Sequence, residues 1–306
     1  MEQIRAVFDL HCDTVSACLE QGCELERNPL QLDLERGCTF PQWVQTFAFW
    51  IDDCYRGEPA WHHCREQRRL FQKFLEGSPQ RLCLWKPGNE LREHCCNALL
   101  SVEGGAAIAG KLSRIETLRE MGVALFTLTW NGDNELASGV LGSDQGLTAL
   151  GKEAVKELER QQIIVDVSHL NQRGFYGVER VSKKPFVATH SNAAAVCPHP
   201  RNLTDDQIRC IAERGGLIGL NFYPLFVNGE QECMIEELIR HAEHILCAGG
   251  EQVLSLGSDF DGAAMPKALP EIMGLENLYQ SMIKYFGGNL TKKIFFENAA
   301  EFFRRI

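Results

Sequence analysis

The sequence lacks any long run of Lys and Arg, and its net charge is −10. Nucleic acids and anionic membrane surfaces bind basic patches, so this balance argues against both as partners. The apolar runs are no longer than a strand, and we expect no transmembrane helix. The first residues, "MEQIRAVFDLHCDT", contain no apolar segment of signal-peptide length. We therefore expect a soluble, cytoplasmic protein.

Several common catalytic motifs are also missing. The chain contains no G-x-S-x-G, no P-loop and no dinucleotide-binding fingerprint. The thirteen cysteines show no paired metal-type spacing, and Cys95 and Cys96 are adjacent instead of forming C-x-x-C. We read them as reduced, mostly buried thiols in a reducing compartment.

Short apolar, β-rich runs alternate with longer amphipathic segments along all 306 residues. This alternation predicts an α/β fold, and eight strands give the count of a (β/α)8 TIM barrel over residues 1–306 as a single domain. A doubly wound open sheet is the competing fold. The predicted strands are 5–11, 44–51, 97–103, 123–130, 163–169, 185–191, 216–223 and 252–260.

Capping residues mark the predicted helices. Thr148 and Thr204 each precede an amphipathic segment, and the second segment stops at Gly215 and Gly216. Two long connections, 131–147 and 261–275, follow the fourth and eighth strands. Loops of this length in a compact domain are usually functional or mobile, and both belong to the face where a barrel carries its active site.

Residues able to bind metal gather at the carboxyl ends of these strands, which converge at one mouth of a barrel. They are His11 and Asp13 after the first strand, Glu103 after the third, His169 after the fifth, His190 after the sixth and Asp259 at the eighth. Taken singly, a histidine at a strand end is more often a hydrogen-bonded structural residue than a ligand, Glu103 could belong to a turn, and Asp259 could cap the next segment. Together they predict a metal site, whereas the other six histidines read mainly as helix-surface or loop residues.

Three histidines with two or three carboxylates suit zinc, and manganese, iron and cobalt are alternatives. Two divalent ions bridged by a carboxylate hold a water between them and lower its pKa, which favours hydrolysis. Glu103 is central among the strands and suits the bridge. Asp259 suits proton transfer to the leaving group.

Six segments resemble the membrane (renal-type) dipeptidase family, the M19 peptidases of the amidohydrolase superfamily. They are "FDLHCDT", "SVEGG", "GLTALGKEAVKELERQQIIVDVSHL", "PFVATHSNAAAVCPHPRNLTDDQI", "GGLIGLNFYP" and "LGSDFDG", in that order. The resemblance covers nearly the whole chain. It implies a metal-dependent (β/α)8 hydrolase with a binuclear zinc site.

Carried over to the matching positions, the resemblance implies that Glu103 bridges two zinc ions. His11 and Asp13 would complete the first site, and His169 and His190 the second. Asp259 would be the acid/base. Arg201 in "HPRN" would bind the C-terminal carboxylate of the substrate, a task that suits a planar guanidinium.

One position departs from the family pattern. Family dipeptidases typically have histidine after "LT" at the fourth strand, where it contacts the substrate, but this chain has Trp130. Tryptophan can donate one hydrogen bond and cannot act as a base. Asn131 is a candidate to replace some of the lost oxyanion stabilisation. Tyr223, at the end of the seventh strand, is expected either to line the pocket or to pack in the core.

The leading hypothesis is a zinc-dependent dipeptidase for small peptides with a free C-terminal carboxylate; the family implies tolerance of a C-terminal D-residue. A related amidohydrolase, such as an N-acyl-amino-acid deacylase or a lactonase, is the alternative that Trp130 motivates. A catalytically inactive metal-binding scaffold is the third reading, which an intact Asp259 disfavours. The oligomeric state stays open, although dimers are common in this family.

Overall fold

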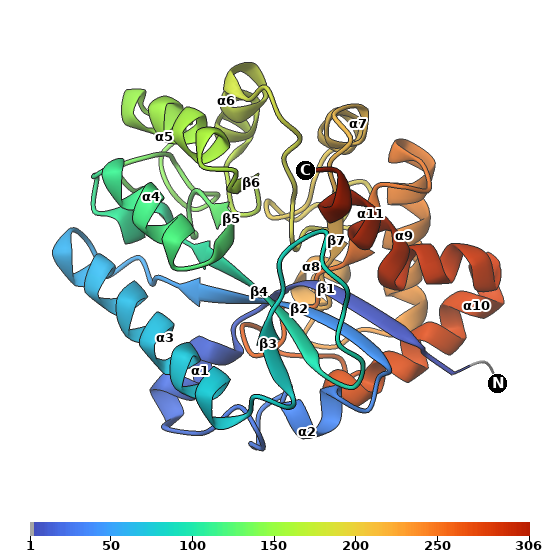
Figure 1. The fold of residues 1–306 in the computed structure, drawn as a ribbon. Coiled ribbons are helices and arrows are strands. Elements are labelled where there is room, and N and C mark those ends of the chain that lie inside the picture. Colours follow the sequence, from blue (N-terminus) through green and yellow to red (C-terminus); the bar gives the residue numbers. More distant parts are fainter. Residues whose placement is uncertain (1–2) are drawn as a thin grey trace.

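Parallel strands form the centre of the molecule, and helices surround them (Figure 1). The computed structural model describes residues 3–306. Its strands are β1 (Ala6–Cys12), β2 (Gln42–Trp50), β3 (Leu82–Leu84), β4 (Cys96–Glu103), β5 (Val123–Thr127), β6 (Ile164–Asp166), β7 (Ile218–Leu220) and β8 (Leu254–Leu256). No helix in this described part of the chain is long and apolar enough to cross a membrane.

The outer layer consists of helices that follow the strands in sequence. They are α1 (Thr14–Gln21), α2 (Leu34–Gly37), α3 (Glu58–Gly77), α4 (Ser113–Glu120), α5 (Ala149–Arg160), α6 (Gln172–Val181), α7 (Asp205–Glu213), α8 (Pro224–Val227), α9 (Ile235–Gly249), α10 (Leu275–Lys292) and α11 (Asn298–Arg305). The predicted caps are confirmed: the Thr148 hydroxyl accepts from Gly151 N–H at 2.9 Å, and Thr204 makes a capping box with Gln207.

The sheet has the order β6-β5-β4-β2-β1-β8-β7. The short strand β3 stands outside this order and pairs with the first residues of β4. Parallel bridges from Asp166 to Val187 and from Ala188 to Ile218 connect the two ends of this order. The segment around residues 187–188 thus stands where the sixth strand was predicted, and it closes the curled sheet. The (β/α)8 prediction is confirmed.

The predicted sixth strand, 185–191, is wrong in length, because only isolated bridges form there. Pro185 has no N–H to donate, and the Thr189 N–H donates to the Asp166 carboxylate at 3.0 Å instead of to a strand carbonyl. The predicted strands around β5, β6, β7 and β8 also end too late. β3 was not predicted, since three residues carry little periodic signal.

A cluster of apolar side chains fills the barrel interior at its amino-terminal end. It includes Phe8, Leu10, Val44, Leu99, Leu125, Val187 and Leu217, and Phe302 and Phe303 of α11 pack against it. The Phe8 and Phe303 rings stack with their centroids 5.2 Å apart. Because α11 packs against the apolar cluster at this end, we expect the active site at the opposite mouth of the barrel.

Candidate metal centre and active site

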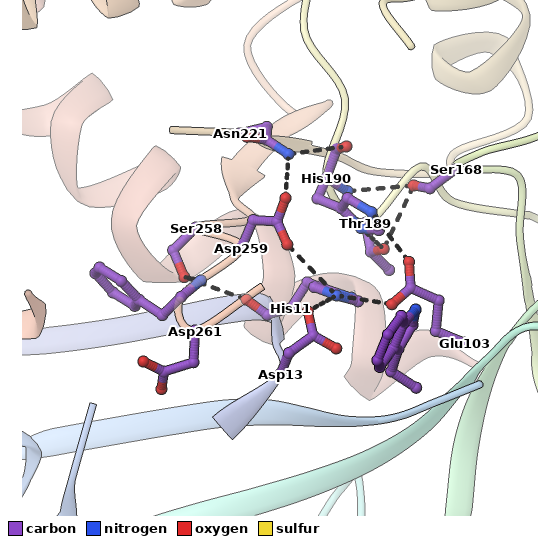
Figure 2. A network of polar contacts seen from close by, with 12 residues as sticks. His11, Asp13, Glu103, Ser168, Thr189, His190, Asn221, Ser258, Asp259 and Asp261 are labelled. Carbon is purple, nitrogen blue, oxygen red and sulfur yellow. Dashed lines mark hydrogen bonds and ion pairs between the residues drawn. The ribbon is translucent and has the colours of Figure 1, made fainter. Parts of the chain in front are cut away.

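The six predicted cluster residues converge at the carboxyl ends of the strands. Figure 2 labels five of them, His11, Asp13, Glu103, His190 and Asp259. His11 is the second-last residue of β1, and Glu103 is the final residue of β4. Asp13 precedes α1, where the chain leaves the strand, and His190 follows the bridged segment 187–188. The fold therefore brings residues from both ends of the sequence to one place.

Two of the six have a backbone conformation that is uncommon for residues other than glycine. His169 has φ of 67° and Asp259 has φ of 65°. Backbone hydrogen bonds hold both in place: Val140 N–H donates to the His169 carbonyl at 2.9 Å, and Asp259 N–H donates to the His11 carbonyl at 3.2 Å. Strained residues of this kind concentrate at functional sites.

The Glu103 carboxylate divides its two oxygens between two groups of histidines. Oε1 lies 2.8 Å from Nε2 of His169 and 3.5 Å from Nε2 of His190. Oε2 lies 3.5 Å from Nε2 of His11. Glu103 is thus the one carboxylate of the cluster that faces both sides, which is the geometry of a bridging ligand.

His11 also faces two aspartates. Its Nε2 lies 3.1 Å from Oδ2 of Asp13 and 3.9 Å from Oδ1 of Asp259. Potential ligand atoms lie within 4.8 Å of one another in two sets among the described residues, His11 with Glu103 and His190, and His11 with Asp13 and Asp259. The predicted ligands are therefore close enough to share cations.

Burial and mutual charge shift the pKa values within this cluster. Burial and the positive charge of His11 lower the pKa of His190 well below its usual value. Burial opposes the charged form of His11, but Glu103 and Asp13 raise its pKa well above the usual value. Burial likewise opposes ionisation of Glu103, yet His11 and His169 hold its pKa well below the usual range. A carboxylate that stays ionised and a neutral imidazole are the forms that bind metal, whereas His11 must release its proton.

The unsatisfied polar atoms of the cluster fit a bound cation. Oδ1 of Asp13 is buried and has no hydrogen-bond partner in residues 3–306. Nε2 of His169 lies 2.9 Å from Nε2 of His190, and each ring already uses Nδ1 elsewhere. Two lone pairs at this distance repel, and a cation ligated by both nitrogens would remove the repulsion.

Neighbouring polar groups orient these two rings. Nδ1 of His169 lies 3.0 Å from Oδ1 of Asn131, and Nδ1 of His190 lies 2.8 Å from Oγ1 of Thr189. The Thr189 hydroxyl donates its hydrogen to Asp166 at 2.7 Å, so its oxygen accepts a hydrogen bond from Nδ1–H of His190. Both rings therefore present Nε2 to the cluster, as metal-binding histidines do when a hydrogen-bond partner at the other ring nitrogen fixes the ring.

Sequence reasoning missed three residues of this network: Asp166, Thr189 and Asn221. The Asn221 amide donates to Oδ2 of Asp259 at 3.0 Å, which leaves Oδ1 on the His11 side. The available signal was the polar residue within an apolar strand, as in "IIVDVSH" and "PFVATHS". A buried polar residue in such a run needs a partner, and here the partner is a neighbouring site residue.

Arg201 lies beside the cluster and is 4% exposed. Its guanidinium lies 5.3 Å from the Phe226 ring centroid, and it donates to the His190 carbonyl at 3.3 Å and to the Ser191 hydroxyl at 3.4 Å. Its Nε has no partner among the described residues. A buried guanidinium with an unused donor is equipped to bind an anionic group.

A cavity of about 530 Å³ opens over the cluster. Trp130, Asn131 and Tyr223 line it, so all three predicted contact residues reach the site. Trp50 was not predicted, and its ring meets that of Trp130 edge to face at 5.0 Å. The Tyr223 ring packs edge to face on the Phe226 ring, with the centroids 4.9 Å apart. Tyr223 therefore both lines the cavity and packs against a neighbouring aromatic residue.

Comparison with known proteins agrees with this geometry. The model of the membrane dipeptidase family (peptidase family M19) matches residues 1–306. A Klebsiella pneumoniae protein described as an uncharacterized protein in the pqqA 5' region is 35% identical, covering 66% of this chain and 79% of that protein. An uncharacterized dipeptidase of Schizosaccharomyces pombe, C3A11.10c, is 33% identical over 62% of this chain, which spans only 47% of that relative's length.

Two solved structures resemble this one closely. The metallo peptidase from Rhodobacter sphaeroides, crystallised with a phosphinate mimic of the dipeptide L-Ala-D-Ala, is 26% identical with a TM-score of 0.91 and covers 99% of both chains. A metallo peptidase of family M19 described as dipeptidase AC is 28% identical with a TM-score of 0.90, again over 99% of both chains.

Proposed function

This chain belongs to the membrane dipeptidase family, peptidase family M19, and on that basis we propose that it is a metal-dependent dipeptidase. It hydrolyses the peptide bond of dipeptides that have a free C-terminal carboxylate, including those with a C-terminal D-residue. The observation that carries this proposal is the Glu103 carboxylate, which faces His169 and His190 with one oxygen and His11 with the other.

We propose two zinc ions as the cofactor. Glu103 would contact both ions, with His11 and Asp13 on one side and His169 and His190 on the other. Nitrogen and carboxylate ligands of this kind suit zinc. When bound, the ions lower the pKa of a water molecule and polarise the scissile carbonyl. The unpartnered Asp13 Oδ1 and the 2.9 Å contact between the two imidazoles support this assignment.

Asp259 is the proposed acid/base. Asn221 donates to its Oδ2 and so fixes the carboxylate, while Oδ1 points to the cluster 3.9 Å from His11. In this position Oδ1 can take a proton from the attacking water and pass it to the leaving amine. The amide of Asn221 keeps the carboxylate from rotating away during the two transfers.

Arg201 is the proposed anchor of the substrate's C-terminal carboxylate. Its partly unpaired guanidinium is held on Phe226 and beside His190, so it would position the peptide bond with little loss of side-chain entropy. A charge-assisted hydrogen bond to a carboxylate is among the stronger polar contacts in proteins.

The test is turnover of a panel of L,L and L,D dipeptides by purified protein that has been stripped of metal and then reloaded with zinc. We expect activity to appear only after reloading, with about two zinc ions per chain by elemental analysis. Absence of metal-dependent cleavage of every dipeptide would contradict the proposal. N-acyl amino acids and lactones belong in the same panel, because the aromatic wall of Trp50 and Trp130 is also compatible with an apolar acyl group.

A further inference from the structure

We propose that the cavity has a subsite for a long cationic side chain on the N-terminal residue of the substrate, formed by Glu20, Trp50 and Trp130. This inference rests on the proposed dipeptidase function and specifies its substrate class, dipeptides that begin with Lys or Arg. All three residues line the cavity above the metal-ligand cluster.

The closed strand order determines which end of a dipeptide reaches this wall. Arg201 contacts His190 and Ser191, next to the segment 187–188 that lies between β6 and β7. Trp50 ends β2, which lies on the opposite side of the ring of strands. A dipeptide with its carboxylate at Arg201 and its peptide bond over the cluster therefore points its N-terminal residue toward Trp50.

Glu20 belongs to the same side of the mouth. It lies on α1, which follows β1, and the backbone N–H of Trp50 donates to Ser16 Oγ of this helix at 3.4 Å. The Trp50 and Trp130 rings are both half-buried and meet edge to face at 5.0 Å. Such a wall covers the alkyl stem of Lys or Arg, and aromatic faces attract their cationic groups.

Glu20 supplies a charge that no other group offsets. It is exposed and makes no hydrogen bond or ion pair in the part of the chain that the structure describes. His63 interacts electrostatically with Glu20, and burial lowers the pKa of this imidazole below its usual value, which favours its uncharged form. Among the described residues, no Lys or Arg lines this cavity; Arg201 lines the adjoining cavity, which shares His169 with it.

The other acids of the wall are already engaged. Asp13, Glu103 and Asp259 belong to the cluster, and Asp261 accepts from the Thr14 hydroxyl at 2.6 Å and from Gln31 N–H at 2.7 Å. Glu20 is therefore the carboxylate that remains available to an incoming cation. Attraction to it, together with contact on the tryptophans, should favour Lys over an apolar chain of similar length by about tenfold.

The experiment compares kcat/KM for lysyl-alanine, norleucyl-alanine and glutamyl-alanine, which share one C-terminal residue. Wild-type zinc-loaded protein should prefer lysyl-alanine to norleucyl-alanine by about tenfold. Glu20→Gln should reduce this ratio several-fold, and Glu20→Lys should favour glutamyl-alanine. Glu24→Lys is the matched control, because Glu24 is exposed and only four residues from Glu20 in sequence but lies outside this cavity.

The outcomes separate this inference from the proposed function. If norleucyl-alanine is cleaved but the Lys preference is absent, or is the same in Glu20→Lys and Glu24→Lys, the inference is wrong and the dipeptidase function stands. If no dipeptide is cleaved, the proposed function is wrong. Calorimetric binding of lysyl-alanine and norleucyl-alanine needs no turnover and still decides the subsite, since a Lys preference must depend on Glu20.

Discussion

Oδ1 of Asn131 lies 3.0 Å from Nδ1 of His169, so a residue predicted as a substrate contact also orients a proposed metal ligand. The contact leaves the Nε2 of His169 directed at Glu103, 2.8 Å away. It also engages the Asn131 side-chain oxygen, so only the amide NH2 remains for a bound substrate. Contact between Asn131 and substrate stays a prediction.

Replacing Asn131 with Ala should weaken zinc binding about 10- to 100-fold, because the His169 ring loses the partner that fixes its tautomer and orientation. Competition with a chromophoric chelator measures this affinity without turnover. Asn131→Asp keeps an acceptor at the same place and should remain close to wild type. Equal losses in the two variants would show that Asn131 does not act through His169.

Asp259→Asn should lower kcat/KM by about 10²- to 10⁴-fold, because the carboxamide cannot carry the proton from water to the leaving group. Zinc content should stay at the wild-type level. Asp261→Asn tests the second aspartate of "SDFDG", whose carboxylate is held by Thr14 and Gln31. A larger catalytic loss at Asp261 than at Asp259 would reverse the proposed roles.

Arg201→Met should raise KM about 10- to 100-fold for dipeptides, with a smaller change in kcat, because it removes a charge-assisted bond to the carboxylate. Dipeptides with an amidated C-terminus give the control. Wild type should discriminate strongly against the amide, and Arg201→Met should process acid and amide nearly alike. Retained discrimination in this variant would exclude Arg201 as the anchor.

Much of the fold could be predicted, because buried parallel strands leave continuous apolar runs and helix caps leave local signals. The strands β1, β2 and β4 have nearly the predicted bounds. The segment 185–191 was predicted as a full strand because its apolar run would be the same whether it forms a full strand or only isolated bridges. The Thr189 N–H is bonded to the Asp166 side chain, on another strand, and the sequence of the segment alone does not reveal this partner.

The cluster was predictable because barrel topology places every strand end at one mouth. The contacts that orient the ligands were not, since they join residues far apart in sequence, as with Asn131 and His169. The role of Trp50 could not be predicted either, because an aromatic residue at a strand end can pack in the core or line a site. Its role became visible only through its contact with Trp130 and its place on the cavity wall.

Zinc should stabilise the folded chain, because the buried cluster binds cations only when folded. At a free zinc concentration 100 times the dissociation constant, the free energy of unfolding should rise by about 2.7 kcal/mol. Thermal unfolding of stripped and reloaded protein measures this change. His190→Ala, which lacks one of the imidazoles, should gain less stability from the same zinc concentration. Equal gains would indicate that zinc stabilises the protein from another site.

His241 contradicts the sequence interpretation of the remaining histidines as helix-surface or loop residues. It lies on α9 but is fully buried, where Nδ1 accepts from Ala193 N–H at 3.1 Å and Nε2 donates to the Val227 carbonyl at 2.7 Å. The helix turns it inward, onto the segment that follows His190 and onto α8. Burial lowers the pKa of His241 below its usual value of 6.5.

This lowered pKa gives His241 a definite effect on stability. Below pH 6.5 the unfolded chain takes up a proton at this residue before the folded chain does, so the free energy of unfolding falls as pH decreases. The slope from one such group reaches at most about 1.4 kcal/mol per pH unit. Urea unfolding of wild type and His241→Gln measures this pH dependence of the free energy of unfolding. It is done at about pH 8 and about pH 5, on either side of the usual titration range of histidine. The stability advantage of wild type should be larger at the higher pH, and an advantage that does not change with pH would show that the pKa of His241 is the same in the folded and unfolded states.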